Sequence, residues 1–174
     1  LPLCGVFGFN QTLTTLAAGK PCVLVESYEI DEIARLIAQH RPSTLLGSDD
    51  MIARLLELVP GEKPFPSVKW MGYAGFNAAL ENIAEVAETR GLILRGPYGM
   101  SEVQALYAIQ PIDAPVAQRK KGGGVVSSPF AHVRVRDPET GELLGPGQPG
   151  ALECAGPSLM VGYWGNEKAT AEAL

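Results

Sequence analysis

The chain has 174 residues, of which 46% are apolar and 19% charged, and its formal net charge is −5. This composition is ordinary for a globular protein, and the acidic balance gives no reason to expect nucleic acid as a partner. The three cysteines are widely separated and there are two histidines, so neither a disulfide framework nor a metal site built on CxxC or histidine pairs is indicated. A reducing, cytoplasmic location fits best, and no apolar run reaches the length of a transmembrane segment.

The first residues, 1–9, are apolar, but no basic segment precedes them, so they are not a convincing signal peptide. The chain also begins without methionine. We therefore expect it to be an internal piece of a longer protein.

The first 112 residues alternate between short apolar runs and helical patterns. Apolar or β-branched runs predict strands at residues 21–25, 43–47, 68–72 and 92–94. Apolar residues spaced i, i+3, i+4 and i+7 predict amphipathic helices between them, on Ile30, Ile33, Ala34 and Ile37, on Ile52, Leu55, Leu56 and Val59, and on Leu80, Ile83, Ala84 and Ala87. An earlier helix is expected over residues 10–18. Pro42 is expected to end the first of the three amphipathic helices, and Ser48 or Asp49 to cap the second.

Strands that alternate with helices in this way predict βαβ units around a parallel sheet. Ligands of such sheets bind outside the carboxyl ends of the strands. Two glycine-bearing loops are expected at those ends, at residues 72–77 after the third strand and 96–102 after the fourth. We predict that the two loops form opposite walls of one crevice, with a plain strand-to-helix turn as the alternative for residues 72–77.

The pattern changes after about residue 111. Proline, glycine and alanine become frequent at residues 111–124, and helical periodicity is lost. Alternating residues predict a half-buried strand at 132–136, and turn clusters separate it from a further strand at 151–154. A helix is expected to begin at Glu167. The predicted fold is α/β, with a βαβ parallel-sheet lobe over residues 1–112 and a smaller β-rich, distorted barrel-like lobe over residues 113–174.

The segment 96–102 concentrates residues suited to nucleotide binding. Gly96 and Gly99 allow the backbone to come close to a ligand, and the ring of Tyr98 could cover a purine base. The Glu102 carboxylate is the kind of oxygen ligand that Mg²⁺ takes together with phosphates. A surface turn with an exposed serine and glutamate is the alternative interpretation of this segment alone.

Tyr98-Gly99-Met100-Ser101-Glu102 resembles the Tyr-Gly-x-(Ser/Thr)-Glu motif of the adenylate-forming (AMP-binding) superfamily. That superfamily includes acyl-CoA synthetases, aryl-CoA ligases, beetle luciferases and the adenylation domains of peptide synthetases. Further segments are similar to the family's motifs in the same order, at residues 1–8, 17–20, 74–77, 150–163 and 169–170. The resemblance covers essentially the whole chain and favours the acyl-CoA synthetase type, with this chain as an internal part of the large N-terminal domain.

The resemblance implies a two-step reaction. A carboxylic acid attacks the α-phosphorus of Mg·ATP, which gives an acyl-adenylate and pyrophosphate, and a thiol then displaces AMP to form a thioester. The implied cofactors are ATP or AMP, Mg²⁺ and, as co-substrate, coenzyme A. The implied partner is a small carboxylic acid, as in fatty acid metabolism.

The resemblance also assigns roles to single residues. Tyr98 would stack on adenine, with the backbone of Gly75 and Phe76 near the other face or edge of the base. Ser101 would bond the α-phosphate and Glu102 would hold Mg²⁺, so these two are the implied catalytic residues. The implied nucleotide-binding set also includes residues that give the backbone room and border the acyl pocket: Gly75, Phe76, Asn77, Gly96, Pro97, Tyr98, Gly99, Met100 and Ser101.

Several positions depart from the family's motifs. Gly5 stands where many members carry a histidine or aromatic residue beside the acyl group, and Ala151 replaces the usual glutamate. Pro97 and the pair Phe76-Asn77 alter the edges of the base pocket.

Parts of the family's machinery are expected outside this chain. The phosphate loop should lie upstream of residue 1, and the ribose-binding aspartate, the hinge and the C-terminal domain with its lysine should lie beyond residue 174. Residues 122–124 are three glycines, but no Lys-Ser/Thr pair and no helix follow them, so they are not that phosphate loop. The chain alone is expected to have little or no ligase activity.

Two alternatives stay open. The parent protein could be an acyl-AMP ligase or an amino-acid-adenylating domain that loads a carrier protein. It could also be a non-catalytic nucleotide-binding or interaction module. The acid, the thiol acceptor and the oligomeric state are left open by the sequence.

Overall fold

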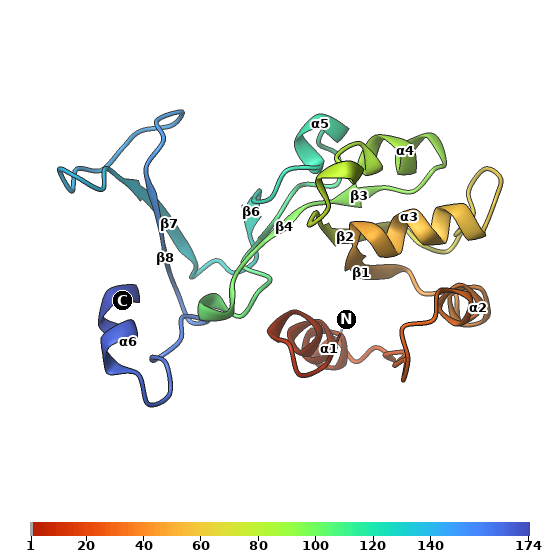
Figure 1. Cartoon of the computed structure of the whole chain (residues 1–174), viewed down its shortest axis with the longest axis horizontal. Coiled ribbons are helices and arrows are strands. Elements are labelled where there is room, and N and C mark those ends of the chain that lie inside the picture. The colour runs from red at the N-terminus through yellow and green to blue at the C-terminus, as the bar shows by residue number, and fades with distance from the viewer. Residues whose placement is uncertain (1) are drawn as a thin grey trace.

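The computed structural model describes residues 2–174, and the first half of the chain forms a mixed α/β lobe (Figure 1). Its main elements are α1 (Val6–Ala17), α2 (Ile30–His40), β1 (Thr44–Ser48), α3 (Asp49–Leu58), β2 (Trp70–Ala74), α4 (Ile83–Thr89) and β3 (Leu94–Arg95). A 3₁₀ turn, Ala78–Leu80, precedes α4. The predicted helices are all present, and the second to fourth predicted strands are displaced by only one or two residues.

β1, β2 and β3 form a parallel sheet with β2 in the middle. Thr44 lies opposite Trp70 at one end of the first pair, and Met71 lies opposite Leu94 in the second pair. This arrangement confirms the predicted parallel sheet. Because parallel strands end on the same side, the segments that follow β2 and β3 emerge at one edge of the sheet.

The main core lies between this sheet and the apolar sides of α2, α3 and α4. Its best-buried members include Ile37, Ile52, Leu55, Met71 and Leu94, each no more than 4% exposed. They come from α2, α3 and the strands, and α4 adds further buried residues, so the periodic apolar pattern of the helices corresponds to a packed interface.

The ends of α2 and α3 follow the predicted chemistry. Arg41 ends α2 in the left-handed region with φ 48 and ψ 51, and Pro42 follows it. Ser48 caps α3, because its Oγ accepts the backbone N–H of Met51 at 3.2 Å.

Residues 21–25, predicted as the first strand, form no strand. Val23, Leu24 and Val25 are 42%, 59% and 40% exposed, so the prediction of a buried strand is wrong. An apolar, β-branched run becomes a strand only where a neighbour pairs with its backbone. Within residues 2–174, β1 at the sheet edge pairs with β2 alone, so no neighbour serves residues 21–25.

The chain leaves the parallel sheet directly after β3. β4 (Pro97–Tyr98), β5 (Ala108–Ile109) and β6 (Val125–Val126) form a short antiparallel sheet, and α5 (Val116–Arg119) lies between β5 and β6 in the sequence. Ala108 pairs with Tyr98 on one side and with Val126 on the other. The predicted boundary between the two lobes is residue 112. The strands of this antiparallel sheet lie on both sides of it, because β4 and β5 precede residue 112 and β6 follows it.

A buried arginine fastens α5 to the parallel lobe. The Arg119 guanidinium donates to the carbonyl oxygens of Leu94 at 2.8 Å and Ala114 at 2.7 Å, and it pairs with Glu88 at 2.6 Å. Arg119 is 2% exposed, and a charge this deep is stable only when its donors are paired. The contact therefore fixes where β3 ends and the antiparallel sheet begins.

Tyr73 of β2 makes a second contact between the parallel lobe and the end of α5. Its hydroxyl donates to the Lys120 carbonyl at 3.0 Å, and the Lys120 ammonium pairs with Glu85 at 2.6 Å. Burial, reinforced by the nearby Glu85 and Asp49 carboxylates, raises the pKa of Tyr73 to about 12. The hydroxyl thus remains a hydrogen-bond donor at neutral pH.

β7 (His132–Arg136) and β8 (Ala151–Ala155) form an antiparallel pair, and α6 (Glu167–Ala173) follows them. Figure 1 shows this pair and α6 projecting away from the α/β lobe. Both strands and the start of α6 agree with the prediction. Within the described residues the antiparallel strands do not close into a barrel, so the β-rich character is confirmed but the barrel-like form is not.

Tyr107 connects β7 and β8 to the antiparallel sheet. Its hydroxyl lies 2.7 Å from the His132 carbonyl oxygen and 2.8 Å from the Ala155 carbonyl oxygen, and donates to them. The ring is buried and forms a second core cluster with Val103 and Ala131. This smaller core supports the segment that follows β4.

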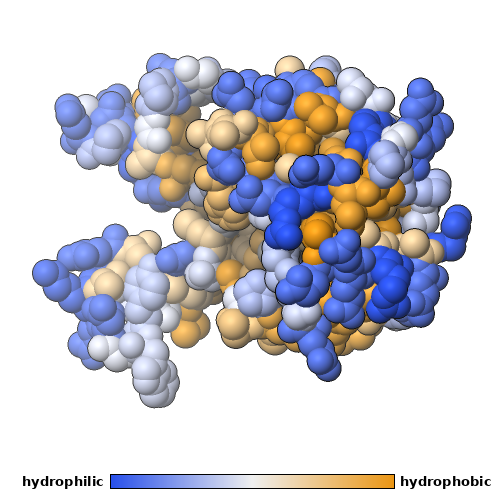
Figure 2. All heavy atoms as spheres, turned by 45° about the vertical axis from the view of Figure 1, so that its right-hand side comes forward, coloured by the Kyte–Doolittle hydropathy of each residue, from blue (hydrophilic) through white to orange (hydrophobic). Residues whose placement is uncertain are grey.

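Apolar side chains also reach the surface. In Figure 2, orange apolar residues alternate with blue hydrophilic ones across the visible face. Phe9, Leu13 and Leu16 of α1 are 48%, 48% and 56% exposed. None of the helices within residues 2–174 has the length and apolar character needed to cross a membrane.

Candidate functional site

Gly96 stands where the chain passes from the parallel to the antiparallel sheet. Its N–H donates to the Arg119 carbonyl at 2.6 Å, and its carbonyl accepts the N–H of Gln110 at 3.1 Å. A Cβ at this position would lie 2.2 Å from the Lys121 carbonyl oxygen. The glycine is therefore required by close approach of the protein's own backbone. Pro97 and Tyr98 continue into β4, which corrects the prediction that the whole segment 96–102 is a loop.

Gly99 is required by an even closer approach. A Cβ there would lie 1.1 Å from the Ala105 carbonyl oxygen. The tight loop is closed by hydrogen bonds from Ala105 N–H to the Met100 carbonyl at 2.9 Å and from Tyr107 N–H to the Tyr98 carbonyl at 3.0 Å. The sequence predicted that Gly99 lets the backbone come close to a ligand; in the structure, the group that comes close is the Ala105 backbone of the same chain.

Tyr98, Ser101 and Glu102 differ in their surroundings. Tyr98 is half-buried and packs against the second core cluster, and burial is the main cause that raises the pKa of its hydroxyl. Ser101 and Glu102 lie on a 3₁₀ turn, Ser101–Val103, whose buried Val103 anchors it in the same cluster. Ser101 is exposed and Glu102 intermediate, so the hydroxyl and the carboxylate face outward from a fixed turn.

A distant segment holds Glu102 in place. The Tyr163 hydroxyl donates to the Glu102 carboxylate, and the N–H of Met160 donates to the Glu102 carbonyl at 2.8 Å. The hydrogen bond from Tyr163 lowers the pKa of Glu102 and raises that of Tyr163. Tyr163 belongs to a recognised Gly-Tyr motif, but no role was predicted for it, because its partner is remote in sequence.

The loop after β2 is held by a residue that the sequence indicated only as a possible helix cap. Asp49 is 1% exposed, and its Oδ2 accepts the backbone N–H of Phe76 at 2.8 Å and of Asn77 at 2.7 Å. The Asn77 Oδ1 accepts the N–H of Ala79 at 3.0 Å and so begins the 3₁₀ turn. Phe76 itself is 80% exposed.

The two predicted loops thus emerge at one edge of the sheet, after the neighbouring strands β2 and β3. The loop after β2 carries the exposed ring of Phe76, and the segment after β4 carries the Ser101 hydroxyl and the Glu102 carboxylate. One carboxylate is enough for Mg²⁺, which is commonly held by one or two carboxylates plus the phosphates of a substrate. No cluster of three or more His, Cys, Asp or Glu side chains suited to a metal occurs in residues 2–174.

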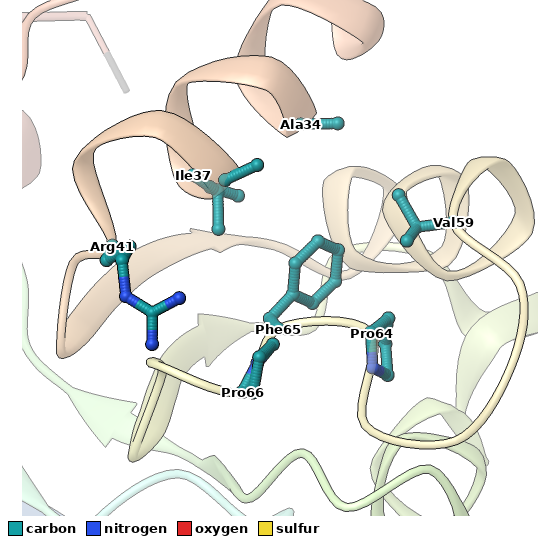
Figure 3. Close-up of a pocket in the computed structure, with 8 residues that line it drawn as sticks. Ala34, Ile37, Arg41, Val59, Pro64, Phe65 and Pro66 are labelled. Carbon is teal, nitrogen blue, oxygen red and sulfur yellow. The ribbon is translucent and has the colours of Figure 1, made fainter.

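A pocket of about 190 Å³ lies elsewhere, between α2, α3 and the loop that precedes β2. Figure 3 shows Ile37, Val59 and Phe65 around it, with Arg41 at one side. Arg41 precedes β1 and Pro66 precedes β2, so the pocket lies at the amino ends of the strands. It is therefore separate from the candidate site at their carboxyl ends.

Comparison with known proteins identifies the family of this chain. The family model described as "AMP-binding enzyme" matches residues 1–164. The chain is 30% identical to 4-coumarate–CoA ligase-like 9 of Arabidopsis thaliana, with 100% of this chain and 31% of that protein covered. It is 28% identical to a feruloyl-CoA synthase of Amycolatopsis sp, with 93% of this chain and 32% of that protein covered. The chain therefore spans about a third of the length of these relatives.

Solved structures show the same fold. ATP-bound MatB from Rhodopseudomonas palustris superposes with a TM-score of 0.83 at 26% identity, covering 99% of this chain and 33% of that one. O-succinylbenzoate coenzyme A synthetase from Bacillus subtilis, in complex with ATP and magnesium ion, superposes with a TM-score of 0.85 at 20% identity. That superposition covers 100% of this chain and 35% of the Bacillus chain.

Proposed function

The chain belongs to the AMP-binding enzyme family, and from this premise we propose that it is an internal part of an ATP-dependent carboxylate–CoA ligase. The parent protein joins a carboxylic acid to the α-phosphate of ATP, releasing pyrophosphate. It then transfers the acyl group from AMP to the thiol of coenzyme A. A free carboxylate is a poor acyl donor, whereas AMP is a good leaving group, so adenylation makes the second step possible.

The observation that supports this proposal is that the segment 96–102 begins directly after β3, at the carboxyl end of a strand of the parallel sheet. Ser101 and Glu102 lie in this segment on a turn anchored by buried Val103, and the loop held by Asp49 follows the neighbouring strand β2. Ligands of open parallel sheets bind at this edge. A rigid turn suits a reaction in which the protein's main task is to position reactants and neutralise phosphate charge.

We assign the residues as follows. Tyr98 borders the adenine, with the backbone of Gly75 and Phe76 on another side of the base. Ser101 donates its hydroxyl to the α-phosphate, and Glu102 holds Mg²⁺, which supplies positive charge next to the phosphates when bound. Asn77, Gly96, Pro97, Gly99 and Met100 complete the proposed nucleotide-binding set by shaping the backbone around these groups.

The substrate is proposed as a small carboxylic acid, without a choice between acid types. Relatives are named for 4-coumarate and ferulate, and another for OPC-8:0, so the names agree on acyl-CoA formation but differ in the acid.

Cys4, Cys22 and Cys154 are free thiols, which supports a reducing, cytoplasmic setting.

The test uses the full-length parent protein and a panel of aromatic and aliphatic acids. We expect pyrophosphate release that requires ATP, Mg²⁺ and one class of acid, followed by thioester formation with coenzyme A. Glu102→Gln should lower the rate of pyrophosphate release about a hundredfold, the size of a lost metal ligand. The matched control Glu139→Gln changes an exposed carboxylate in a distant turn and should leave the rate unchanged.

Other outcomes separate the alternatives. Acyl transfer to a carrier protein and not to coenzyme A would show that the parent protein is a carrier-loading enzyme and not a CoA ligase. ATP binding without pyrophosphate release for any acid would indicate a non-catalytic nucleotide-binding module. Wild-type rates of pyrophosphate exchange by the 174-residue chain alone would contradict its assignment as part of a larger catalytic unit.

A further inference from the structure

A buried carboxylate joins the start of α3, directly after β1, to the loop that follows β2. The Oδ2 atom of Asp49 accepts the N–H groups of Phe76 and Asn77 at 2.8 and 2.7 Å, and its Oδ1 accepts the N–H of Asp50 at 2.9 Å. Asp49 is 1% exposed. Placing a carboxylate in such a position is costly unless hydrogen bonds replace its water, and here three backbone donors do so.

Capping of α3 does not account for this aspartate. Ser48 already caps the helix through the N–H of Met51. The two bonds of Asp49 Oδ2 instead reach across to the loop that follows β2, whose last residue, Ala74, lies opposite Ser48 in the parallel register. The carboxylate therefore meets the backbone of the loop after β2, at the edge of the sheet where the proposed site lies.

The adjacent side chains extend this contact. The Asn77 amide donates to Asp50 Oδ1 at 3.2 Å, while Asn77 Oδ1 accepts the N–H of Ala79 at 3.0 Å. The loop is thereby fixed at its backbone and at one side chain. Phe76, between these contacts, is 80% exposed, so the network holds the backbone still while leaving the ring free to meet a ligand.

We propose that Asp49 is a positioning residue for nucleotide binding, which fixes the loop of residues 75–77 in the conformation that receives the base. This inference rests on the proposed function. Asp49 does not touch the nucleotide; it acts through the backbone of Phe76 and Asn77. Its loss should therefore weaken ATP binding while leaving the carboxylic acid site and the chemistry largely unaffected.

The test compares three variants of the full-length protein. Asp49→Ala removes all three acceptor contacts, whereas Asp49→Asn keeps an oxygen that can accept the two loop N–H groups. Ser48→Ala is the matched control, because it removes the cap of the same helix and leaves the loop contacts intact. The measurements are KM for ATP, KM for the acid and kcat of pyrophosphate release, with thermal unfolding in parallel.

We expect Asp49→Ala to raise KM for ATP about tenfold, in line with the sensitivity of reactions to small misplacements. KM for the acid should change by less than about twofold, and Asp49→Asn should restore most of the loss, since a neutral oxygen still bonds both N–H groups. Ser48→Ala should lower the melting temperature but leave KM for ATP unchanged. If Asp49→Ala does not fold, Asp49→Leu takes its place, because leucine is close to aspartate in shape but has no acceptor, and the same rise in KM for ATP is expected.

Two results would overturn the inference while leaving the proposed function intact. One is an unchanged KM for ATP in a folded variant that lacks the acceptor, Asp49→Ala or Asp49→Leu. The other is an equal rise in Ser48→Ala, which would place the effect in the stability of α3. If the wild-type parent neither binds ATP nor releases pyrophosphate, the proposed function itself fails and the inference fails with it.

Discussion

The hydroxyl of Tyr163 donates a hydrogen bond to the carboxylate of Glu102, a residue that lies 61 positions earlier in the chain. The N–H of Met160 adds a second contact, to the Glu102 carbonyl at 2.8 Å. The same distant segment thus orients both the backbone and the side chain of the glutamate that is proposed to hold Mg²⁺. A group that hydrogen-bonds a metal ligand commonly tunes its orientation and affinity.

Tyr163→Phe tests this contact in the full-length protein. The ring remains but the donor is lost, so the carboxylate can rotate away from its productive orientation. We expect the Mg²⁺ concentration that gives half-maximal pyrophosphate release to rise about tenfold, the usual size of such an effect on metal affinity. The measurement is a Mg²⁺ titration of the initial rate at saturating ATP and acid.

The matched control is Tyr28→Phe, which makes the same substitution at an exposed tyrosine whose ring faces Arg54 on the α3 side of the molecule. It should leave the Mg²⁺ dependence unchanged. An unaltered titration in Tyr163→Phe would show that the contact does not influence the metal site.

Gly99→Ala tests the tight loop after β4. The added Cβ would lie 1.1 Å from the Ala105 carbonyl oxygen, so the loop has to open and its hydrogen bonds have to break. We expect a loss of about 3 kcal/mol or more in the free energy of unfolding, at the upper end for overpacking. Urea denaturation of the full-length protein measures this difference.

Gly122→Ala is the control for that substitution. Its nearest contact would be the Pro97 carbonyl oxygen at 3.5 Å, an ordinary van der Waals distance. We expect a change within about 1 kcal/mol. Similar losses in both variants would mean that the loop around Gly99 is looser than its contacts indicate.

The Glu85–Lys120 pair gives a prediction for pH. The hydrogen bond from Lys120, followed by one from the Glu85 backbone, lowers the pKa of Glu85 below its ordinary value of 4.5. A carboxyl with a lowered folded-state pKa stabilises the protein above its unfolded-state pKa, and this stability is lost as pH falls through the folded-state value. Both side chains are about one-third exposed, so the contribution should stay below about 1 kcal/mol.

We therefore expect Lys120→Met to be less stable than the wild type at pH 7, with the difference shrinking as the pH falls below the ordinary Glu85 pKa of 4.5. Urea denaturation across this pH range measures it. Lys168→Met, which removes the partner of Glu172 at 3.9 Å on the exposed α6, should show no such pH-dependent difference. A difference that persists unchanged at low pH would assign the effect to packing of the Lys120 side chain.

The sequence predicted those parts of the fold that depend on local pattern. The apolar spacing from Ile30 to Ile37 and the Ser48 cap needed no knowledge of distant residues, and both are present. Residues 21–25 have equally good strand composition, but a strand also depends on a partner, which composition does not reveal. The prediction therefore failed where pairing decided the outcome.

The candidate site shows the same distinction. The motif around Tyr98 and Glu102, together with its glycines, can be recognised from residues that are adjacent in the sequence. The contact of Asp49 with Phe76 spans 27 positions, and that of Tyr163 with Glu102 spans 61. Such contacts arise only once strands and loops are placed side by side, which is why the sequence did not predict that Asp49 and Tyr163 hold these segments.

Tyr107 has a consequence for how β7 and β8 align. Its single hydroxyl hydrogen is shared between the carbonyl oxygens of His132 and Ala155, which are partners across the two strands. A slip of one residue in either strand would turn one of these carbonyls to the opposite direction. The hydroxyl would then lose an acceptor inside a core. Tyr107 thus discriminates against misaligned pairings and selects one register of an otherwise short and exposed ribbon.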